Sequence, residues 1–151
     1  MVERLLRAVI DTNVWVSALL NPAGHPAEVL AAFKRGGFLP VLSPSLLAEL
    51  RDVLTRPRIR RRIPVPDAAV AEAVDLIETR AVRVTPPGDL RICRDPNDDH
   101  VIETAVIGRA TFLVTRDDDL KRDWDLVTYL QAESIEVVSV AAFLRELPPP
   151  R

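Results

Sequence analysis

The feature that most constrains the fold is a short apolar segment near the start of the chain that ends abruptly in a carboxylate. Residues 8–10 are Ala-Val-Ile, and Asp11 follows them directly, ahead of Thr12, Asn13 and a helix-like segment. A continuous apolar run of this kind is typical of a buried central strand in a parallel sheet. Open parallel sheets form their sites at the carboxyl ends of the strands. Asp11 is therefore predicted to lie at such a site.

Strand-like and helix-like segments alternate along the rest of the chain. Strands are predicted over residues 5–10, 38–42, 81–85, 111–115 and 135–138, and helices over 14–20, 26–35, 45–55, 67–79, 97–109 and 141–147. This alternation predicts an α/β fold, a three-layer α/β/α sandwich with a central, mainly parallel sheet. Because no internal repeat or linker interrupts it, residues 1–147 are expected to form a single domain, followed by a proline-rich tail over 148–151.

Composition excludes several classes of protein. The 151 residues are 48% hydrophobic and 28% charged, which is ordinary for a globular domain. No apolar run approaches the ~20 residues of a membrane helix. Cys93 is the only cysteine, so no internal disulfide is possible, and a reducing cytoplasm is the expected location. With two histidines and one cysteine, a zinc site of the usual ligands is not expected.

Glu49 is placed on or beside the apolar stripe of the predicted helix 45–55. It lies three residues after Leu46 and four before Val53. Carboxylates are rarely buried unless they are paired or coordinate a metal, so Glu49 is predicted to face a site. Two alternatives stay open at this point. Glu49 could lie at the edge of the stripe and reach water, and Asp11 could serve as a helix N-cap.

Three neighbouring aspartates require separate interpretations. Asp95 precedes Pro96 and is the natural N-cap of the next helix. Asp98 falls three residues later, where an acid favours the helix dipole, so it is predicted to be mainly structural. Asp99 has no capping role and shares a helix face with Ile102, so it is assigned to the site. On this interpretation, Asp99→Asn should stabilise the metal-free protein, because it removes one of several repelling charges.

Asp117 and Asp119 follow the apolar strand 111–115 as Asp11 follows the first strand. Asp117 is the preferred site residue of this pair and Asp119 the second choice. Asp11, Glu49, Asp99 and Asp117 are therefore predicted to hold a divalent metal, with Asp119 as a further ligand and Thr12, Asn13 and Thr115 in support. Hard cations such as Mg²⁺ prefer carboxylate oxygens. No side chain is predicted to act as a protein nucleophile, since Ser17, Ser43 and Ser45 lack a histidine partner at any recognisable spacing.

Four motifs in order resemble a PIN domain. They are Asp-Thr-Asn-Val at 11–14, Ser-Pro-Ser-x-x-x-Glu-Leu at 43–50, Arg-Asp-Pro-x-Asp-Asp-x-x-x-Glu-x-Ala at 94–105 and Val-Thr-x-Asp-x-Asp-Leu at 114–120. The resemblance spans roughly residues 5–143. It is strongest to the toxin components of type II toxin–antitoxin systems.

The resemblance implies an endoribonuclease that depends on Mg²⁺ or Mn²⁺. The acidic positions of the family fall on Asp11, Glu49, Asp99 and Asp117, and its polar residue near the first acid on Asn13. His100 stands where the subgroup often has lysine and is given no function. RNA is the implied substrate, and a cognate antitoxin and a second copy in a homodimer are the implied partners. The alternative is a catalytically silent nucleic-acid-binding module with the same fold.

A basic segment bounded by Pro57 and Pro64 is expected to contribute to RNA affinity rather than to chemistry. Its arginines are Arg56, Arg58, Arg60, Arg61 and Arg62. The planar guanidinium group of arginine binds phosphate well, because it can donate two hydrogen bonds to it at once. The alternative is a solvated turn, or arginines that form salt bridges with acids of the same chain.

Overall fold

The computed structural model describes residues 5–149, and its centre is a five-stranded sheet in which every neighbouring pair of strands is parallel. The strand order is β3-β2-β1-β4-β5. The strands are β1 (Arg7–Ile10), β2 (Leu39–Leu42), β3 (Val82–Arg83), β4 (Phe112–Val114) and β5 (Glu136–Val138). The predicted fold class is confirmed. The most apolar segments, β1 and β4, lie side by side in the middle, with Ala8 opposite Phe112 and Ile10 opposite Val114.

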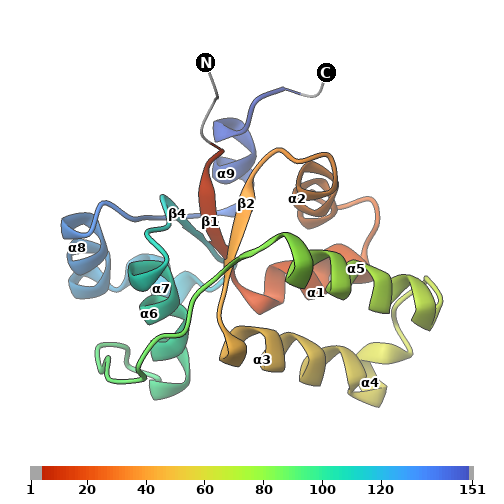
Figure 1. The fold of residues 1–151 in the computed structure, drawn as a ribbon, viewed down its shortest axis with the longest axis horizontal. Coiled ribbons are helices and arrows are strands. Elements are labelled where there is room, and N and C mark those ends of the chain that lie inside the picture. Colours follow the sequence, from red (N-terminus) through yellow and green to blue (C-terminus); the bar gives the residue numbers. More distant parts are fainter. Residues whose placement is uncertain (1–4, 150–151) are drawn as a thin grey trace.

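Helices cover both faces of the sheet (Figure 1). They are α1 (Thr12–Leu20), α2 (His25–Lys34), α3 (Pro44–Thr55), α4 (Pro57–Arg60), α5 (Asp67–Arg80), the 3-10 helix η1 (Pro96–Asp98), α6 (Asp99–Ile107), α7 (Asp118–Arg122), α8 (Trp124–Ala132) and α9 (Val140–Glu146). On one side α6 packs against β1, β2 and β4, with α8 next to it along β5; on the other, α2 lies between α1 and α9 (Figure 1). None of the helices within residues 5–149 is long and apolar enough to cross a membrane.

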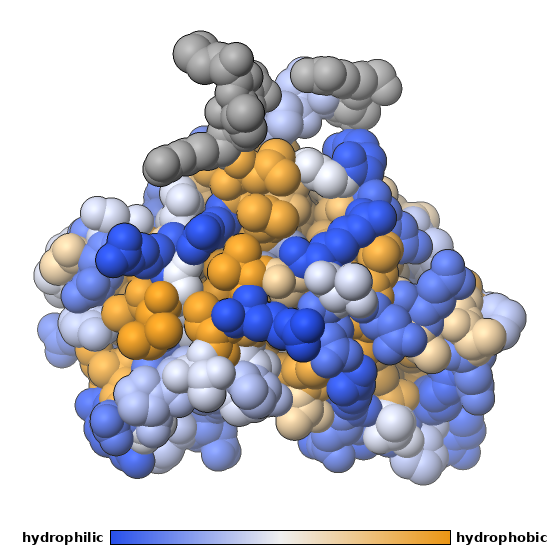
Figure 2. Space-filling view, viewed as in Figure 1, coloured by the Kyte–Doolittle hydropathy of each residue, from blue (hydrophilic) through white to orange (hydrophobic). Residues whose placement is uncertain are grey.

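The core fills the space between the sheet and these helices. Val9 and Leu113, in the two central strands, are fully buried. Phe33, Phe38 and Phe143 are buried together and meet edge-on or tilted, with ring centroids 5.0 to 6.2 Å apart. Burial of apolar surface at about 25 cal/mol per Å² is the main stabilising term in a fold of this kind. Figure 2 shows that some apolar surface remains in the middle of one face, while hydrophilic residues dominate its lower part.

Gly108 allows α6 to end directly against β2. A Cβ built at this position would lie 2.2 Å from Cγ1 of Val41 and 2.9 Å from the carbonyl oxygen of Thr104. Such contacts are too short for any side chain, so this close approach of helix and strand requires glycine. The N-terminal end of α6 is thereby held at the carboxyl edge of the sheet, near α3.

Candidate metal centre

Asp11 follows β1 and is oriented by a threonine at the end of β4. Thr115 Oγ1 donates a hydrogen bond of 2.8 Å to Asp11 Oδ2, and Thr115 is fully buried. The parallel register places Ile10 opposite Val114, so the residues that follow both strands are neighbours. Although Asp11 precedes α1, its side chain makes no capping hydrogen bond to that helix. Its carboxylate therefore faces the end of β4 rather than capping α1.

Glu49 approaches the same edge from α3. Thr12 Oγ1, at the start of α1, donates a 2.8 Å hydrogen bond to Glu49 Oε2, and Thr12 is buried. The Glu49 side chain is 41% exposed, so it lies at the boundary between the core and solvent. The two threonines thus hold one carboxylate each, Thr12 that of Glu49 and Thr115 that of Asp11.

Asp117 is the third acid at this edge. Its backbone N–H donates to Thr115 Oγ1 at 2.9 Å, so one threonine hydroxyl connects the segments that carry Asp11 and Asp117. Asp117 Oδ1 also caps α7 by accepting from the N–H of Asp119 at 2.9 Å. Asp119 and Asn13, which were predicted to assist, are both exposed.

Asp98 and Asp99 lie in different surroundings in the structure. Asp99 is 6% exposed, and its Oδ1 accepts from the N–H groups of Ile92 and Cys93 at 3.0 and 2.8 Å. Burial by itself would raise the pKa of Asp99, but these two amides outweigh it and lower the pKa. The Asp99 side chain caps no helix, as predicted, but it binds the preceding loop, which the sequence did not indicate.

Asp98 is the residue of this pair whose pKa is raised by the charges of other acids. Burial raises its pKa to about 6, and the negative charges of Asp95, Asp117, Asp11 and Glu49 add to the increase. It makes no capping hydrogen bond to α6, but it lies in the first turn of η1 behind the Asp95 cap, as predicted. These charges make Asp98 a candidate member of the site at the sheet edge.

We call Asp11, Glu49, Asp98 and Asp117 the acidic cluster. The pKa of Asp11 is also raised, mainly by burial and further by the charges of Glu49 and Asp117. Each of these acids is thus within electrostatic range of others in the set. Like charges gathered in this way favour protonation, or a cation that neutralises them.

The donor set fits a hard divalent cation such as Mg²⁺ or Mn²⁺. All four side chains offer only carboxylate oxygens, which these ions prefer. Among residues 5–149, no three His, Cys, Asp or Glu side chains form a ready-made metal cage. Mg²⁺ commonly binds in this open manner, since it keeps several waters and uses one or two carboxylates together with substrate phosphate.

Comparison with known proteins decides the family. The family model described as "PIN domain" matches residues 7–119, a span that includes all four acids of the cluster. The chain belongs to the PIN domain family. PIN domains are generally nucleases, and they commonly use divalent metals.

One relative of this PIN domain is an uncharacterized protein of Methanocaldococcus jannaschii, MJ1680. The two are 29% identical over 132 residues, which cover 87% of this chain and 84% of the archaeal protein. No solved structure matches the chain. The similarity therefore extends over most of both chains without adding a specific activity.

His100 lies beside the acidic cluster of this PIN domain in a way that the sequence did not predict. Its Nδ1 is 3.1 Å from Ser45 Oγ, so Ser45 does have a histidine partner, 55 residues away in the chain. His100 Nε2 is 3.7 Å from Glu49 Oε2, which is too long for a hydrogen bond. Because the histidine is not oriented by this carboxylate, the three residues do not form a catalytic triad.

Some arginines of the basic segment form ion pairs with aspartates, and others form none within residues 5–149. Arg56 pairs with Asp52 at 2.8 Å, and Arg60 pairs with Asp67 at the start of α5. The Asp67 carboxylate makes no capping hydrogen bond to α5. Arg58 and Arg62 are exposed and form no ion pair within residues 5–149.

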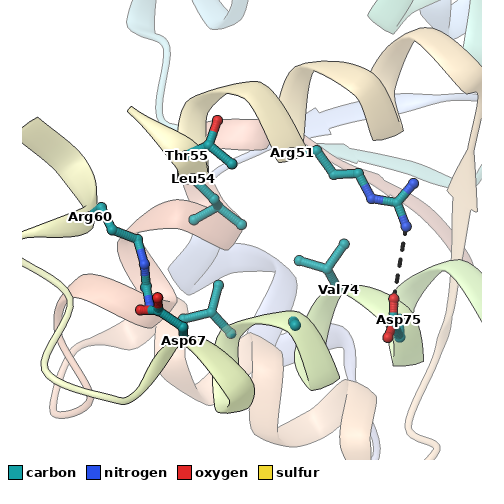
Figure 3. Close-up of a pocket in the computed structure, with 9 residues that line it drawn as sticks. Arg51, Leu54, Thr55, Arg60, Asp67, Val74 and Asp75 are labelled. Atoms are coloured by element: carbon teal, nitrogen blue, oxygen red, sulfur yellow. Dashed lines mark ion pairs between the residues drawn. The ribbon is translucent and has the colours of Figure 1, made fainter. Parts of the chain in front are cut away.

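A cavity of about 360 Å³ opens between α3 and α5 (Figure 3), and no acid of the acidic cluster is among its lining residues. Leu54 and Val74 are among its apolar lining, and the ion pairs Arg51–Asp75 and Arg60–Asp67 lie beside it. Because each arginine here already has a carboxylate partner, this cavity offers no free positive charge to a nucleic acid.

Proposed function

We propose that this PIN domain is an endoribonuclease that hydrolyses RNA phosphodiester bonds with the aid of Mg²⁺ or Mn²⁺. The observation that supports the proposal is that Asp11, Glu49 and Asp117 follow β1, β2 and β4 at the carboxyl edge of a parallel sheet, where buried threonines bind Asp11 and Glu49. Burial, and then the charges of neighbouring acids, raise the pKa of Asp98 at the same edge. The family supplies the general kind of chemistry, that of a nuclease.

The residues of the acidic cluster have distinct parts in this proposal. Asp11, Glu49, Asp98 and Asp117 would hold the cation, which would supply charge stabilisation at the scissile phosphate and activation of a water. Thr115 fixes the orientation of Asp11, and Thr12 that of Glu49, because each hydroxyl donates directly to the carboxylate. Asp99 does not bind the cation in this proposal. It binds the loop ahead of η1 and so sets the position of Asp98.

We further propose that the protein is the toxin of a toxin–antitoxin pair, that it acts in the cytoplasm and that it forms a homodimer. The support for these finer assignments is the resemblance of the four sequence motifs to that subgroup. A cognate antitoxin is the corresponding protein partner.

The basic segment is proposed as part of the RNA-binding surface, in a narrower form than the sequence suggested. Arg58 and Arg62 are the proposed phosphate contacts, since both are exposed and neither is neutralised by an ion pair among the residues described. Arg56 and Arg60 are held by carboxylates of their own chain and are expected to contribute less. Arg61 donates from Nε to the carbonyl of Pro57 at 3.2 Å, which leaves its terminal nitrogens for phosphate.

The test is cleavage of a mixed-sequence RNA by purified protein with Mn²⁺, with excess EDTA, and with two matched variants. Wild type should cleave with Mn²⁺ and stop in EDTA. Asp98→Asn should lose about 100-fold or more, because even groups behind metal ligands cost 10–100-fold when removed. Asp125→Asn, which removes an exposed acid on α8, should retain full activity.

Two results would contradict the proposal in different ways. Cleavage that persists in excess EDTA would exclude the metal-dependent mechanism. RNA binding without cleavage under any divalent ion would support the alternative, a catalytically silent nucleic-acid-binding module.

A further inference from the structure

A second cavity, of about 300 Å³, adjoins the acidic cluster on the side of β5 and α9. The residues that line it come from the start of α2, the end of β4, α7 and the start of α9, and they include Thr115, Arg116, Lys121 and Val140. Thr115 belongs to both places, since its hydroxyl donates to Asp11 while the residue also lines the cavity. One residue, Thr115, therefore connects the cavity with Asp11 of the acidic cluster.

Arg116 gives this cavity a positive charge that no carboxylate neutralises within residues 5–149. Its Nη1 donates to the neutral hydroxyl of Ser17 at 2.6 Å, which fixes the guanidinium group without cancelling its charge. Lys121 is more constrained, because its Nζ lies 3.0 Å from Asp118 Oδ1. The remaining N–H groups of a held, planar guanidinium suit a phosphate, which they can contact at two points.

Two cationic side chains, Arg116 and Lys121, lie in a lining that is otherwise largely apolar. The ring of His25 also lines the cavity, and its Nδ1 lies 2.8 Å from Glu28 Oε2. Arg116 is therefore the group of this lining best suited to a phosphate. The cavity between α3 and α5 differs in the decisive respect, since both of its arginines are paired with aspartates. Of the two, only the cavity beside Thr115 combines an unneutralised cation with direct contact to the acidic cluster.

We propose that this cavity is a subsite for an RNA phosphodiester that neighbours the one cleaved, with Arg116 as its main contact and Lys121 as a secondary one. The assignment rests on the proposed ribonuclease function, and it specifies the path of the RNA strand on one side of the acidic cluster. It predicts that Arg116 acts in substrate binding and not in the binding of the metal ion.

The first experiment compares Arg116→Gln with the matched control Arg145→Gln, which removes an exposed arginine from α9. Binding of a fluorescent RNA oligonucleotide is measured in EDTA over a range of KCl concentrations, and cleavage kinetics are measured in Mn²⁺. Arg116→Gln should weaken binding about tenfold or more and raise KM, since a hydrogen bond to a charged group is lost. Its salt slope should fall by about one unit, and its stabilisation by Mn²⁺ should match wild type.

The outcomes separate this proposal from the proposed function. Cleavage by wild type together with identical binding and salt slopes for the two arginine variants would overturn the subsite and leave the ribonuclease standing. A reduced salt slope for Arg116→Gln in a protein that never cleaves would keep Arg116 as an RNA phosphate contact, but would overturn the ribonuclease and with it the position next to a cleaved bond.

A second experiment tests the location of the contact. RNA substrates carry one uncharged methylphosphonate linkage, placed at each position around the cleavage site in turn. At one position next to the scissile bond, wild type and Arg116→Gln should become equal in KM, because the phosphate charge that Arg116 contacts is already gone. If the variant is impaired to the same degree on every analogue, no neighbouring phosphate is held by Arg116 and the proposal fails.

Discussion

Asp98 and Asp99 are adjacent in sequence, yet they occupy opposite electrostatic environments. Burial and four neighbouring carboxylates raise the pKa of Asp98 to about 6. Asp99 is more deeply buried, but two backbone N–H groups of the preceding loop lower its pKa. Replacing Asp98 by asparagine and replacing Asp99 by asparagine should therefore change the stability in opposite directions.

For the metal-free protein we predict that Asp98→Asn is stabilising and Asp99→Asn destabilising. The first removes a repelled charge, worth on the order of 1 kcal/mol or several degrees in Tm. The second weakens the hydrogen bonds that the side chain accepts from two backbone N–H groups, which should lower the free energy of unfolding by about 1–3 kcal/mol. Thermal melting in EDTA and then in Mn²⁺ measures both effects. Wild type and Asp99→Asn should gain stability from Mn²⁺, while Asp98→Asn should gain much less.

The opposite order would contradict this assignment. If Asp99→Asn raised the metal-free Tm and lost its response to Mn²⁺, Asp99 would belong to the metal site, as the sequence alone suggested. Asp125→Asn is the control for both variants, because it removes an exposed acid on α8 that is not part of the acidic cluster.

Sequence patterns could identify the acidic segment around residue 98 but not which of its aspartates faces the site. The prediction assumed one regular helix from residue 97, whereas the structure has a 3-10 turn over Pro96–Asp98 before α6 begins. A 3-10 turn has 3.0 residues per turn instead of 3.6, so it changes the direction of each side chain. The amides that bind Asp99 belong to an irregular loop, which periodicity does not describe.

At the scale of elements, α6 holds the preceding loop by two carboxylates one helical turn apart. Besides Asp99, the buried Glu103 accepts from the N–H groups of Gly88 and Leu90 at 2.6 and 2.7 Å. Burial would raise the pKa of Glu103, but these amides outweigh it and lower the pKa below its ordinary 4.5. The charged form of Glu103 therefore stabilises the fold, and with it the position of η1.

We predict a specific acid dependence from this arrangement. Because the folded state lowers the pKa of Glu103, its contribution is complete above about pH 4.5 and is lost as the pH falls through the folded value. Glu103→Gln should be less stable than wild type at pH 7 by about 1–3 kcal/mol and should lose less stability on acidification. Urea unfolding from pH 7 to pH 3 measures this. Glu72→Gln, at an exposed position of α5, should keep the acid dependence of wild type, and equal slopes for all three proteins would contradict the prediction.

The predicted strands and long helices are present because apolar runs and proline or glycine boundaries define them well. Ser43, for example, caps α3 by accepting from the N–H of Leu46 at 3.3 Å. The helices α7 and α8 were not predicted. Both are short, and the only buried residues are Leu120 in α7 and Leu126 and Leu130 in α8, so their apolar pattern is weak. Trp124 begins α8 at 78% exposure, which obscures that pattern further.

For the whole molecule, topology explains why acids from distant segments meet. Every strand of an all-parallel sheet points the same way, so the segments after β1, β2 and β4 emerge at one edge, where α6 also begins. That convergence could be predicted from the sequence. The contacts of Ser45 with His100 and of Arg116 with Ser17 could not, because each joins residues more than 50 positions apart without a periodic signal.

The central claim is that Asp11, Glu49, Asp98 and Asp117 together bind a divalent cation. Anomalous diffraction from crystals soaked in Mn²⁺ tests it most directly, because the manganese positions are observed independently of any activity. We predict an anomalous peak among these four carboxylates, with Asp98 as a ligand and Asp99 still bound to the amides of Ile92 and Cys93. A peak coordinated by Asp99, or crystals saturated with Mn²⁺ that show no peak at this edge of the sheet, would contradict the account.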